Sequence, residues 1–170
     1  LLMLTQICFS QYNYVPNPSF EEYERCPIFF SQLERSLGWR RATSSAPDYF
    51  RHCDDIYFVD VPETFHGYQQ PKTGLAYAGL MIYLQNSYDY KEYIEVTLMQ
   101  PLISGMPYKV SFFCSLSDYS SSYASNDLGV VLSVGNLGQN MQFTSIIPET
   151  SPIKSDQMIL ETNDWVKVEG

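Results

Sequence analysis

The sequence has few basic side chains and no long apolar run. Among its 170 residues, 10 are Lys or Arg and 19 are Asp or Glu, which gives a formal net charge of -9. Such a chain should repel nucleic acid and anionic lipid, because both are negatively charged, so neither is an expected partner. No stretch reaches the roughly 18 apolar residues that a membrane-spanning helix requires. We therefore expect no transmembrane segment in the chain.

Motifs of the common enzyme classes are also missing. The sequence contains no Gly-x-Ser-x-Gly elbow, no His-Glu-x-x-His and no P-loop. The cysteines form no close pairs and the only histidines, His52 and His66, are interpreted as surface or loop residues, so a zinc site is not expected. A glycosidase would need two carboxylates, and the candidates are Asp48, Asp54, Asp55 and Asp60. Acid-rich loops are usually solvated, and we predict that the protein is not an enzyme.

Residues 1–10 are uncharged and mostly apolar, which is typical of the end of a signal peptide. Cys8 and Ser10 are small residues at positions -3 and -1 of a possible cleavage site before Gln11. A lipoprotein signal is disfavoured because Ile7, rather than a small residue, precedes Cys8. We assign residues 1–10 to the C-terminal part of a signal peptide and residues 11–170 to one domain. The alternative is that residues 1–10 form an N-terminal strand of that domain.

Short alternating runs of apolar and polar residues dominate the rest of the chain. In residues 93–98, for example, Ile94, Val96 and Leu98 alternate with Glu95 and Thr97. Similar strand signals occur in residues 14–22, 56–61, 74–84, 108–116, 127–134, 141–147 and 165–168. One short helix is possible in residues 28–37, before Gly38. About eight short strands and little helix predict an all-β fold, an antiparallel β-sandwich.

Two cysteines flank a loop-rich stretch, Cys26 and Cys53. Export permits a disulfide, and we predict one between them. In the chain-entropy model it would stabilise the fold by about 3–4 kcal/mol. Cys114 lies in an alternating run and is predicted to be a buried free thiol.

The opening words of the domain, Val15-Pro16-Asn17-Pro18-Ser19-Phe20-Glu21, resemble those of carbohydrate-binding (galactose-binding-like) jelly rolls. They look still more like the N-terminal modules of secreted and OmpA-like cell-surface proteins of Bacteroidota. Further similar blocks cover most of residues 13–170: Pro47-Asp48-Tyr49-Phe50 with Cys53, Gly67-Tyr68-Gln69, residues 74–79, Tyr93-Ile94 with Leu98, and Thr162-Asn163-Asp164-Trp165.

This resemblance implies a jelly roll that is secreted or associated with the outer membrane of the cell envelope, as part of a larger protein. The family pattern continues beyond Gly170, which implies that the domain lacks its final strand here. In related sugar-binding jelly rolls the acid after the aromatic often binds a structural Ca²⁺, so the resemblance makes Glu21 a calcium candidate. The alternative is a solvated carboxylate, because Ca²⁺ takes about six to eight oxygen ligands and no others are evident.

Aromatic residues beside polar ones are the candidate ligand contacts. The chain has 14 Tyr and 2 Trp, and sugar rings stack their C–H faces on such rings while amides and carboxylates bind their hydroxyls. The candidates are Trp39, Asp48, Tyr49, Tyr68, Gln69 and Tyr119, with Tyr88, Tyr90 and Tyr123 as further loop tyrosines. Trp39, Tyr49 and Tyr68 could instead serve packing.

Two functions remain open at this point. The first is a non-catalytic carbohydrate-binding module that binds a glycan. The second is a structural or adhesive spacer of a larger surface protein, which contacts other cell-surface proteins and binds no small ligand.

Overall fold

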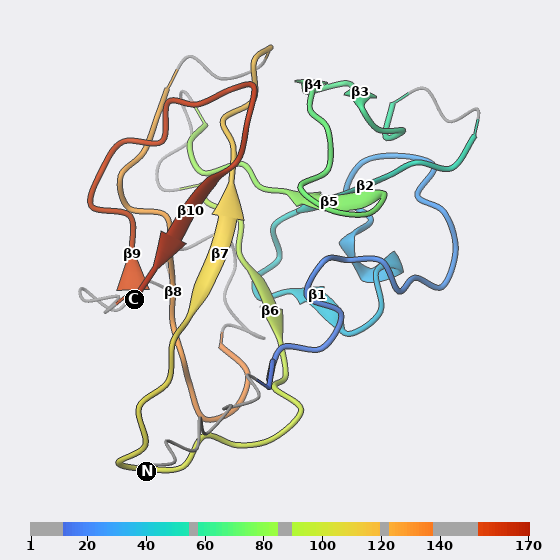
Figure 1. The fold of residues 1–170 in the computed structure, drawn as a ribbon. Helices are drawn as coiled ribbons and strands as arrows, with labels where there is room; N and C mark the ends of the chain where they lie inside the picture. The colour runs from blue at the N-terminus through green and yellow to red at the C-terminus, as the bar shows by residue number, and fades with distance from the viewer. Residues whose placement is uncertain (1–11, 55–57, 85–89, 120–122, 138–152) are drawn as a thin grey trace, which may run out of the picture.

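The computed structural model describes residues 12–54, 58–84, 90–119, 123–137 and 153–170 (Figure 1). These residues form an all-β chain of short strands with one short 3₁₀ helix, η1 (Leu33–Arg35). The strands are β1 (Trp39–Arg41), β2 (Asp48–Arg51), β3 (Glu63–Thr64), β4 (Gly67–Tyr68), β5 (Ala76–Gly79), β6 (Ile94–Val96), β7 (Ser111–Cys114), β8 (Gly129–Val130), β9 (Ile153–Lys154) and β10 (Val166–Glu169).

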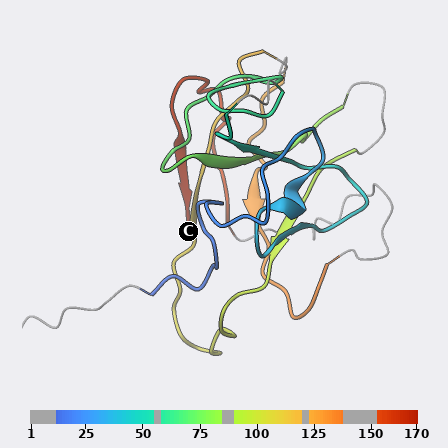
Figure 2. The same ribbon diagram turned by 90° about the vertical axis from the view of Figure 1, so that its right-hand side faces the viewer.

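Every ladder among these strands is antiparallel and two strands wide. The pairs are β1–β6, β2–β5, β3–β4, β7–β10 and β8–β9. Only β3 and β4 form a tight hairpin, and the other pairs join segments far apart in the sequence. In both views the β2–β5 ladder runs across the β7–β10 ladder rather than along it (Figures 1 and 2).

Among the described residues, the core has two apolar clusters, one at each of these two ladders. Phe50, Val59 and Val61 are buried together, with Phe30 and Tyr77 packed against them. The second cluster contains Cys114, Ile159 and Val168, with Phe112, Leu128 and Val166 at its margin. As the sequence predicted, Cys114 is a buried free thiol.

Residues 14–22 are not a strand, contrary to the sequence-based expectation. Asn17 and Phe20 both have positive φ, at 44° and 62°, so the chain turns twice here. The side chain of Asn17 holds the turn, because its amide donates to the carbonyls of Glu22 and Leu37 and its oxygen accepts the N–H of Glu22. Side-chain hydrogen bonds thus replace the ladder that a strand would have formed.

The predicted helix in residues 28–37 is reduced to the single turn of η1. Ser31 has a φ of 58°, which interrupts a right-handed helix, and the side chain of Gln32 accepts the N–H groups of Ile28 and Phe29. The strand expected in residues 56–61 is also wrong for its described part. Residues 58–61 form a turn that buries Val59 and Val61, and β3 begins only after Pro62.

Other strands agree with the sequence. β5, β6, β7 and β8 lie within the runs predicted in residues 74–84, 93–98, 108–116 and 127–134, and β10 is displaced by one residue from the run in 165–168. The strand predicted in residues 141–147 lies outside the described residues. Strands β1 and β2 were not predicted, because residues 26–55 read as irregular.

Candidate functional site

The β3–β4 hairpin places Tyr68 on the surface, where 54% of the residue is exposed. Thr64 closes the hairpin, since its hydroxyl donates to the carbonyl of Gly67 at 3.1 Å and accepts the N–H of His66 at 3.2 Å. The N–H of Gln69 donates to the carbonyl of Pro62 at 2.8 Å, just outside the ladder. The exposed ring therefore stands on a backbone whose hydrogen bonds are local and well formed.

The segment after β7 lies against this hairpin. Asp118 Oδ1 accepts the N–H of Tyr68 at 3.0 Å, and the hydroxyl of Ser115 donates to Gln69 Oε1 at 2.8 Å. The approach is close enough to require glycine at position 67, because a Cβ there would lie 1.7 Å from Asp118 Oδ1 and 3.1 Å from the Cβ of Tyr119. Tyr119, which is 78% exposed, therefore packs its Cβ close to Gly67, the residue before Tyr68.

Gln70 and Trp165 complete the arrangement. Gln70 Nε2 donates to the hydroxyl of Tyr68 at 2.9 Å, and Trp165 Nε1 donates to the carbonyl of Gln70 at 2.7 Å. The ring of Trp165 meets the ring of Tyr77 edge-on, with centroids 5.5 Å apart. Burial raises the pKa of the Tyr77 phenol, so Tyr77 stays neutral as a support for the tryptophan.

These contacts define what we call the tyrosine surface: Tyr68, Gln69, Gln70, Asp118 and Tyr119. The structure brings together three of the residues predicted from sequence, Tyr68, Gln69 and Tyr119. Sequence reasoning missed Gln70 and Asp118. Gln70 had a signal, because a residue two positions after Tyr68 in extended chain lies on the same face.

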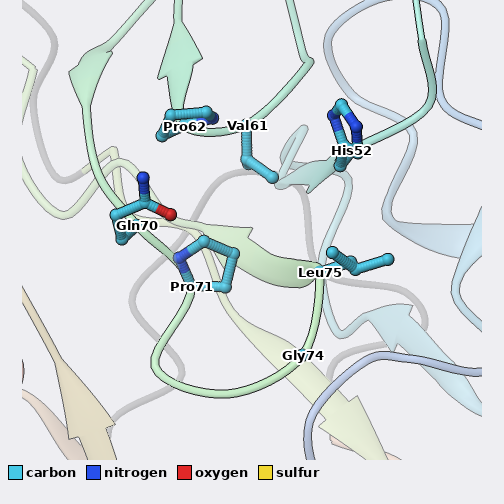
Figure 3. Close-up of a pocket in the computed structure, with 7 residues that line it drawn as sticks. All are labelled: His52, Val61, Pro62, Gln70, Pro71, Gly74 and Leu75. Atoms are coloured by element: carbon cyan, nitrogen blue, oxygen red, sulfur yellow. The ribbon is translucent and has the colours of Figure 1, made fainter.

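A shallow pocket of about 200 Å³ opens next to the tyrosine surface (Figure 3). Its lining is mostly apolar, with polar groups from His52 and Gln70: His52, Val61, Pro62, Gln70, Pro71, Gly74 and Leu75. Gln70 belongs to both features, since its amide also binds the hydroxyl of Tyr68. His52 is oriented by Asp60, whose Oδ1 lies 3.0 Å from its Nδ1, and by Asp54, 3.4 Å from its Nε2.

Three other predicted ligand residues lie in structural positions away from this surface. Tyr49 is fully buried, at 0% exposure, and its hydroxyl donates to the carbonyl of Phe20 at 2.8 Å, so its ring offers no face to a ligand. Trp39 packs on Phe20 with centroids 4.7 Å apart. Its Nε1 donates to the carbonyl of Asn17 at 2.9 Å.

Asp48, the remaining candidate, is buried between loops. Its Oδ1 accepts the N–H of Ser31 at 2.7 Å and its Oδ2 lies 3.3 Å from His66 Nε2. His66 lies in the β3–β4 turn, as interpreted from sequence, but it is half-buried among phenylalanines. Asp48 therefore ties β2 to the hairpin and to the η1 loop.

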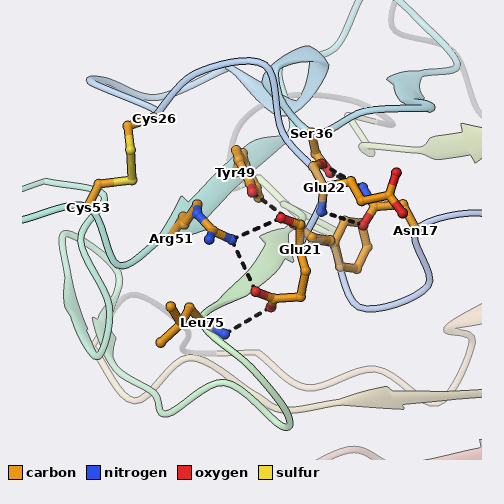
Figure 4. Close-up of polar contacts among 10 residues, drawn as sticks. Asn17, Glu21, Glu22, Cys26, Ser36, Tyr49, Arg51, Cys53 and Leu75 are labelled. Carbon is orange, nitrogen blue, oxygen red and sulfur yellow. Dashed lines mark hydrogen bonds and ion pairs between the residues drawn. A yellow bond between two sulfur atoms is a disulfide. The ribbon is translucent and has the colours of Figure 1, made fainter.

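Glu21, the calcium candidate, points both carboxylate oxygens at protein donors (Figure 4). Oε2 lies 3.1 Å from Arg51 Nη1, and Oε1 accepts the N–H of Leu75 at 2.9 Å. A guanidinium at this position repels a metal cation. Among the described residues, no group of three or more His, Cys, Asp or Glu side chains could hold a metal ion. In this structure Arg51 and the N–H of Leu75 occupy the carboxylate of Glu21, and its role as a calcium ligand stays a prediction.

Cys26 and Cys53 lie at disulfide distance, with sulfur atoms 2.10 Å and Cα atoms 6.0 Å apart (Figure 4). This agrees with the pairing predicted from the sequence. The bridge joins the loop before η1 to the end of β2, close to the Glu21–Arg51 contact.

Comparison with known proteins gives no relative: no protein-family model, no curated protein and no solved structure matches the chain. The resemblance carried by the sequence blocks thus stays a prediction. In the described part of the chain, no helix is long and apolar enough to cross a membrane.

Proposed function

We propose that the chain is a non-catalytic, exported carbohydrate-binding module of jelly-roll type. Its glycan-binding site is the tyrosine surface together with the pocket beside it. The observation that carries the proposal is the arrangement around Gln70, whose amide binds the hydroxyl of the exposed Tyr68 and also lines the pocket. One end of the site is thus aromatic and open, and the other is concave and mostly apolar.

The chemistry of this surface suits a sugar. A pyranose ring has an apolar C–H face, which can stack on the exposed rings of Tyr68 and Tyr119, and hydroxyls at its edge, which need hydrogen-bond partners. Gln69, Gln70 and Asp118 supply amide and carboxylate groups beside those rings. Because the backbone of Tyr68 is fixed by Asp118 and by its ladder with Glu63, little ordering entropy is lost when a ligand binds.

A binding role, rather than a glycosidase, agrees with the surroundings of two of the four acids considered from sequence, Asp48 and Asp60; Asp55 lies outside the described residues. Asp48 is buried and holds Ser31 and His66. Asp60 accepts the N–H of Cys53 at 3.0 Å and contacts His52. Both carboxylates already serve the fold, which supports the proposal that the module binds without cutting.

The setting of the proposed module is the cell envelope. The signal-peptide character of residues 1–10 and the Cys26–Cys53 pair both suit export into an oxidising compartment. By its resemblance to the N-terminal modules of OmpA-like proteins, the module would carry a larger surface protein to its glycan.

The experiment is affinity electrophoresis of the full chain through gels that contain members of a polysaccharide panel. We expect retardation by at least one glycan. Tyr68→Ala and Tyr119→Ala should each weaken binding by about 3- to 10-fold, because each removes a stacking ring, and should leave the melting temperature unchanged.

Tyr12→Ala is the matched control, because Tyr12 is also an exposed tyrosine but contacts Tyr14 and Met99 instead of the hairpin. Its binding should equal that of the wild type. A folded protein whose mobility is unchanged on every glycan would overturn the proposal, as would equal losses for Tyr12→Ala and Tyr68→Ala.

A second function, the structural or adhesive spacer, is favoured by one other observation. Phe29, Phe58 and Phe65 are exposed and surround the ring of Phe30, with centroids 4.6, 6.0 and 5.0 Å from it. Exposed apolar groups of this kind often mark protein contacts. Under this alternative, Phe65→Ser reduces adhesion of cells that display the protein, whereas Tyr68→Ala leaves adhesion unchanged.

A further inference from the structure

Two exposed tyrosine rings from distant segments lie in contact. The ring centroids of Tyr83 and Tyr123 are 4.5 Å apart, and the ring planes are inclined to each other by 54°. About half of each residue is exposed, at 53% and 50%. Neither residue belongs to the tyrosine surface or to the pocket, so the proposed function leaves this contact without a role.

The backbone is anchored close to each of the two tyrosines. Met81, two residues before Tyr83, donates its N–H to Glu92 Oε2 at 2.8 Å, and its carbonyl accepts the N–H of Glu92 at 2.9 Å. Ser125, two residues after Tyr123, accepts a backbone N–H from the second core cluster at 3.1 Å. The ring contact is therefore held by the fold on both sides.

The geometry of this pair differs from that of two other tyrosine contacts. Tyr12–Tyr14 and Tyr14–Tyr108 have centroids 5.2 and 5.7 Å apart, and both meet at 89°, so that the edge of one ring points at the face of the other. In the closer, inclined pair of Tyr83 and Tyr123 the rims of the two rings can meet, and carbons in contact are about 3.5–4.0 Å apart. Because exposed side chains rotate rapidly, a small rotation brings together the carbons ortho to the two hydroxyls.

We propose that Tyr83 and Tyr123 form a site of oxidative cross-linking, at which a haem peroxidase that uses hydrogen peroxide joins the two rings by a carbon–carbon bond. Each phenol loses one electron and its proton, which leaves two phenoxyl radicals. A bond forms between one ortho carbon of each ring, and the hydrogen on each of these carbons moves to the neighbouring oxygen, so both phenols are restored. The two electrons and two protons reduce one hydrogen peroxide to two molecules of water.

The contact favours coupling within one molecule. Reactive groups that are already held together react far faster than groups that must meet by diffusion. The product ties the chain between β5 and β6 to the chain between β7 and β8. Like a disulfide, this bond restricts the unfolded chain, but a thiol reductant cannot break it. The inference does not depend on glycan binding.

The test treats the full chain with a haem peroxidase and hydrogen peroxide over a range of protein concentrations. Dityrosine is detected by its fluorescence, and tandem mass spectrometry identifies the linked residues. We expect a monomeric product that is lighter by two hydrogen atoms and is linked through Tyr83 and Tyr123. Its yield per chain should not depend on protein concentration. Oxidation of the exposed Met81 to the sulfoxide adds oxygen instead and is counted separately.

Three variants assign the cross-link to this pair. Tyr83→Phe and Tyr123→Phe keep a ring at each position but remove one phenol, so each should lose the dityrosine fluorescence of the monomer. Tyr12→Phe is the matched control, because Tyr12 is similarly exposed, at 58%, and contacts a different tyrosine. Its yield should equal that of the wild type. The cross-linked wild type should also unfold at a higher urea concentration than the untreated chain, whereas oxidised Tyr83→Phe should show no such shift.

Three results would overturn the inference. The first is a wild-type chain without dityrosine in a mixture that converts N-acetyltyrosinamide to its dimer, since the oxidant is then active. The second is a monomer fluorescence in Tyr83→Phe equal to that of the wild type. The third is dityrosine found only in covalent dimers, because tyrosines of two molecules would then be reacting, for which Tyr119 at 78% exposure is available. Each of these results leaves the proposed glycan-binding function standing.

Discussion

The guanidinium of Arg51 lies 3.1 Å from the carboxylate of Glu21 and 4.0 Å from the centre of the Tyr23 ring. Arg51 comes from β2, Glu21 from the turn before η1, and the other oxygen of Glu21 binds the N–H of Leu75, just before β5. One partly buried ion pair thus joins three segments that are separated in the sequence. This ion pair therefore fixes Leu75, which lines the pocket, relative to β2.

Replacement of Arg51 should therefore destabilise the fold. Removing one partner of a buried ion pair costs about 3–5 kcal/mol, and since a third of the Glu21 side chain is exposed, we expect about 1–3 kcal/mol for Arg51→Met. Urea denaturation measures this loss. Arg41→Met is the control, because Arg41 also pairs with a glutamate at 3.1 Å but both side chains are about half exposed. Equal losses for the two variants would contradict the structural role of Arg51.

Calcium should leave the stability of the protein unchanged. Because Arg51 faces the carboxylate of Glu21, we expect the same melting temperature with calcium and with a chelator. Differential scanning calorimetry is the measurement. A melting temperature that rises with calcium in the wild type, and does not rise in Glu21→Gln, would show that a metal displaces the arginine.

Gly74→Ala should lower the free energy of unfolding more than Gly105→Ala does. Gly74 has a φ of +66°, and a Cβ there would lie 2.3 Å from Glu21 Oε1, so the substitution combines backbone strain with displacement of the carboxylate. Gly105 has a φ of +81° but nothing within 4 Å of its Cβ position. Gly105→Ala should cost about 1–2 kcal/mol from the left-handed conformation alone. If Gly74→Ala unfolds at the same urea concentration as Gly105→Ala, the close packing of Glu21 against Gly74 does not contribute to stability.

The buried carboxyl of Glu92 should make stability depend on pH. It accepts hydrogen bonds from the N–H of Met81 and the hydroxyl of Tyr90, both at 2.8 Å, yet burial raises its pKa above the ordinary 4.5. The folded state therefore retains a proton that the unfolded state has already lost. The stabilisation is complete below pH 4.5 and disappears as the pH rises through the folded pKa.

In Glu92→Gln this share of the pH dependence should be missing, because glutamine does not titrate. Urea denaturation across a pH series gives the slope of the unfolding free energy for each protein. Glu24→Gln, which changes an exposed glutamate, should keep the wild-type slope. A wild-type slope in Glu92→Gln would show that another group titrates.

Loss of the Cys26–Cys53 bridge should destabilise the chain by about 2–4 kcal/mol. The bridged residues are 27 positions apart, so the unfolded chain gains considerable freedom without it. The double variant Cys26→Ala, Cys53→Ala should unfold at a lower urea concentration than the wild type, and reductant should have no further effect on it. Cys114→Ala should remain sensitive to reductant, because Cys114 is not part of the bridge.

Several features of the candidate site were predictable and others were not. Tyr68, Gln69 and Tyr119 were singled out from sequence because aromatic residues beside polar ones suit a sugar. Tyr49 has the same local pattern but lies fully inside the fold. Whether a tyrosine offers its ring to a ligand depends on which distant segments cover it, and no local pattern contains that information.

By itself, the sequence determined the all-β character of the chain, the place of most alternating strands and the free thiol, because a period of two and a run of β-formers are local properties. It also predicted which two cysteines lie at disulfide distance. Only the tertiary structure decided that residues 14–22 turn twice and that Glu21 faces Arg51. The same holds for the meeting of the β3–β4 hairpin with Asp118 and Trp165. Each of these depends on contacts between residues far apart in the chain, where packing and hydrogen bonding outweigh local preference.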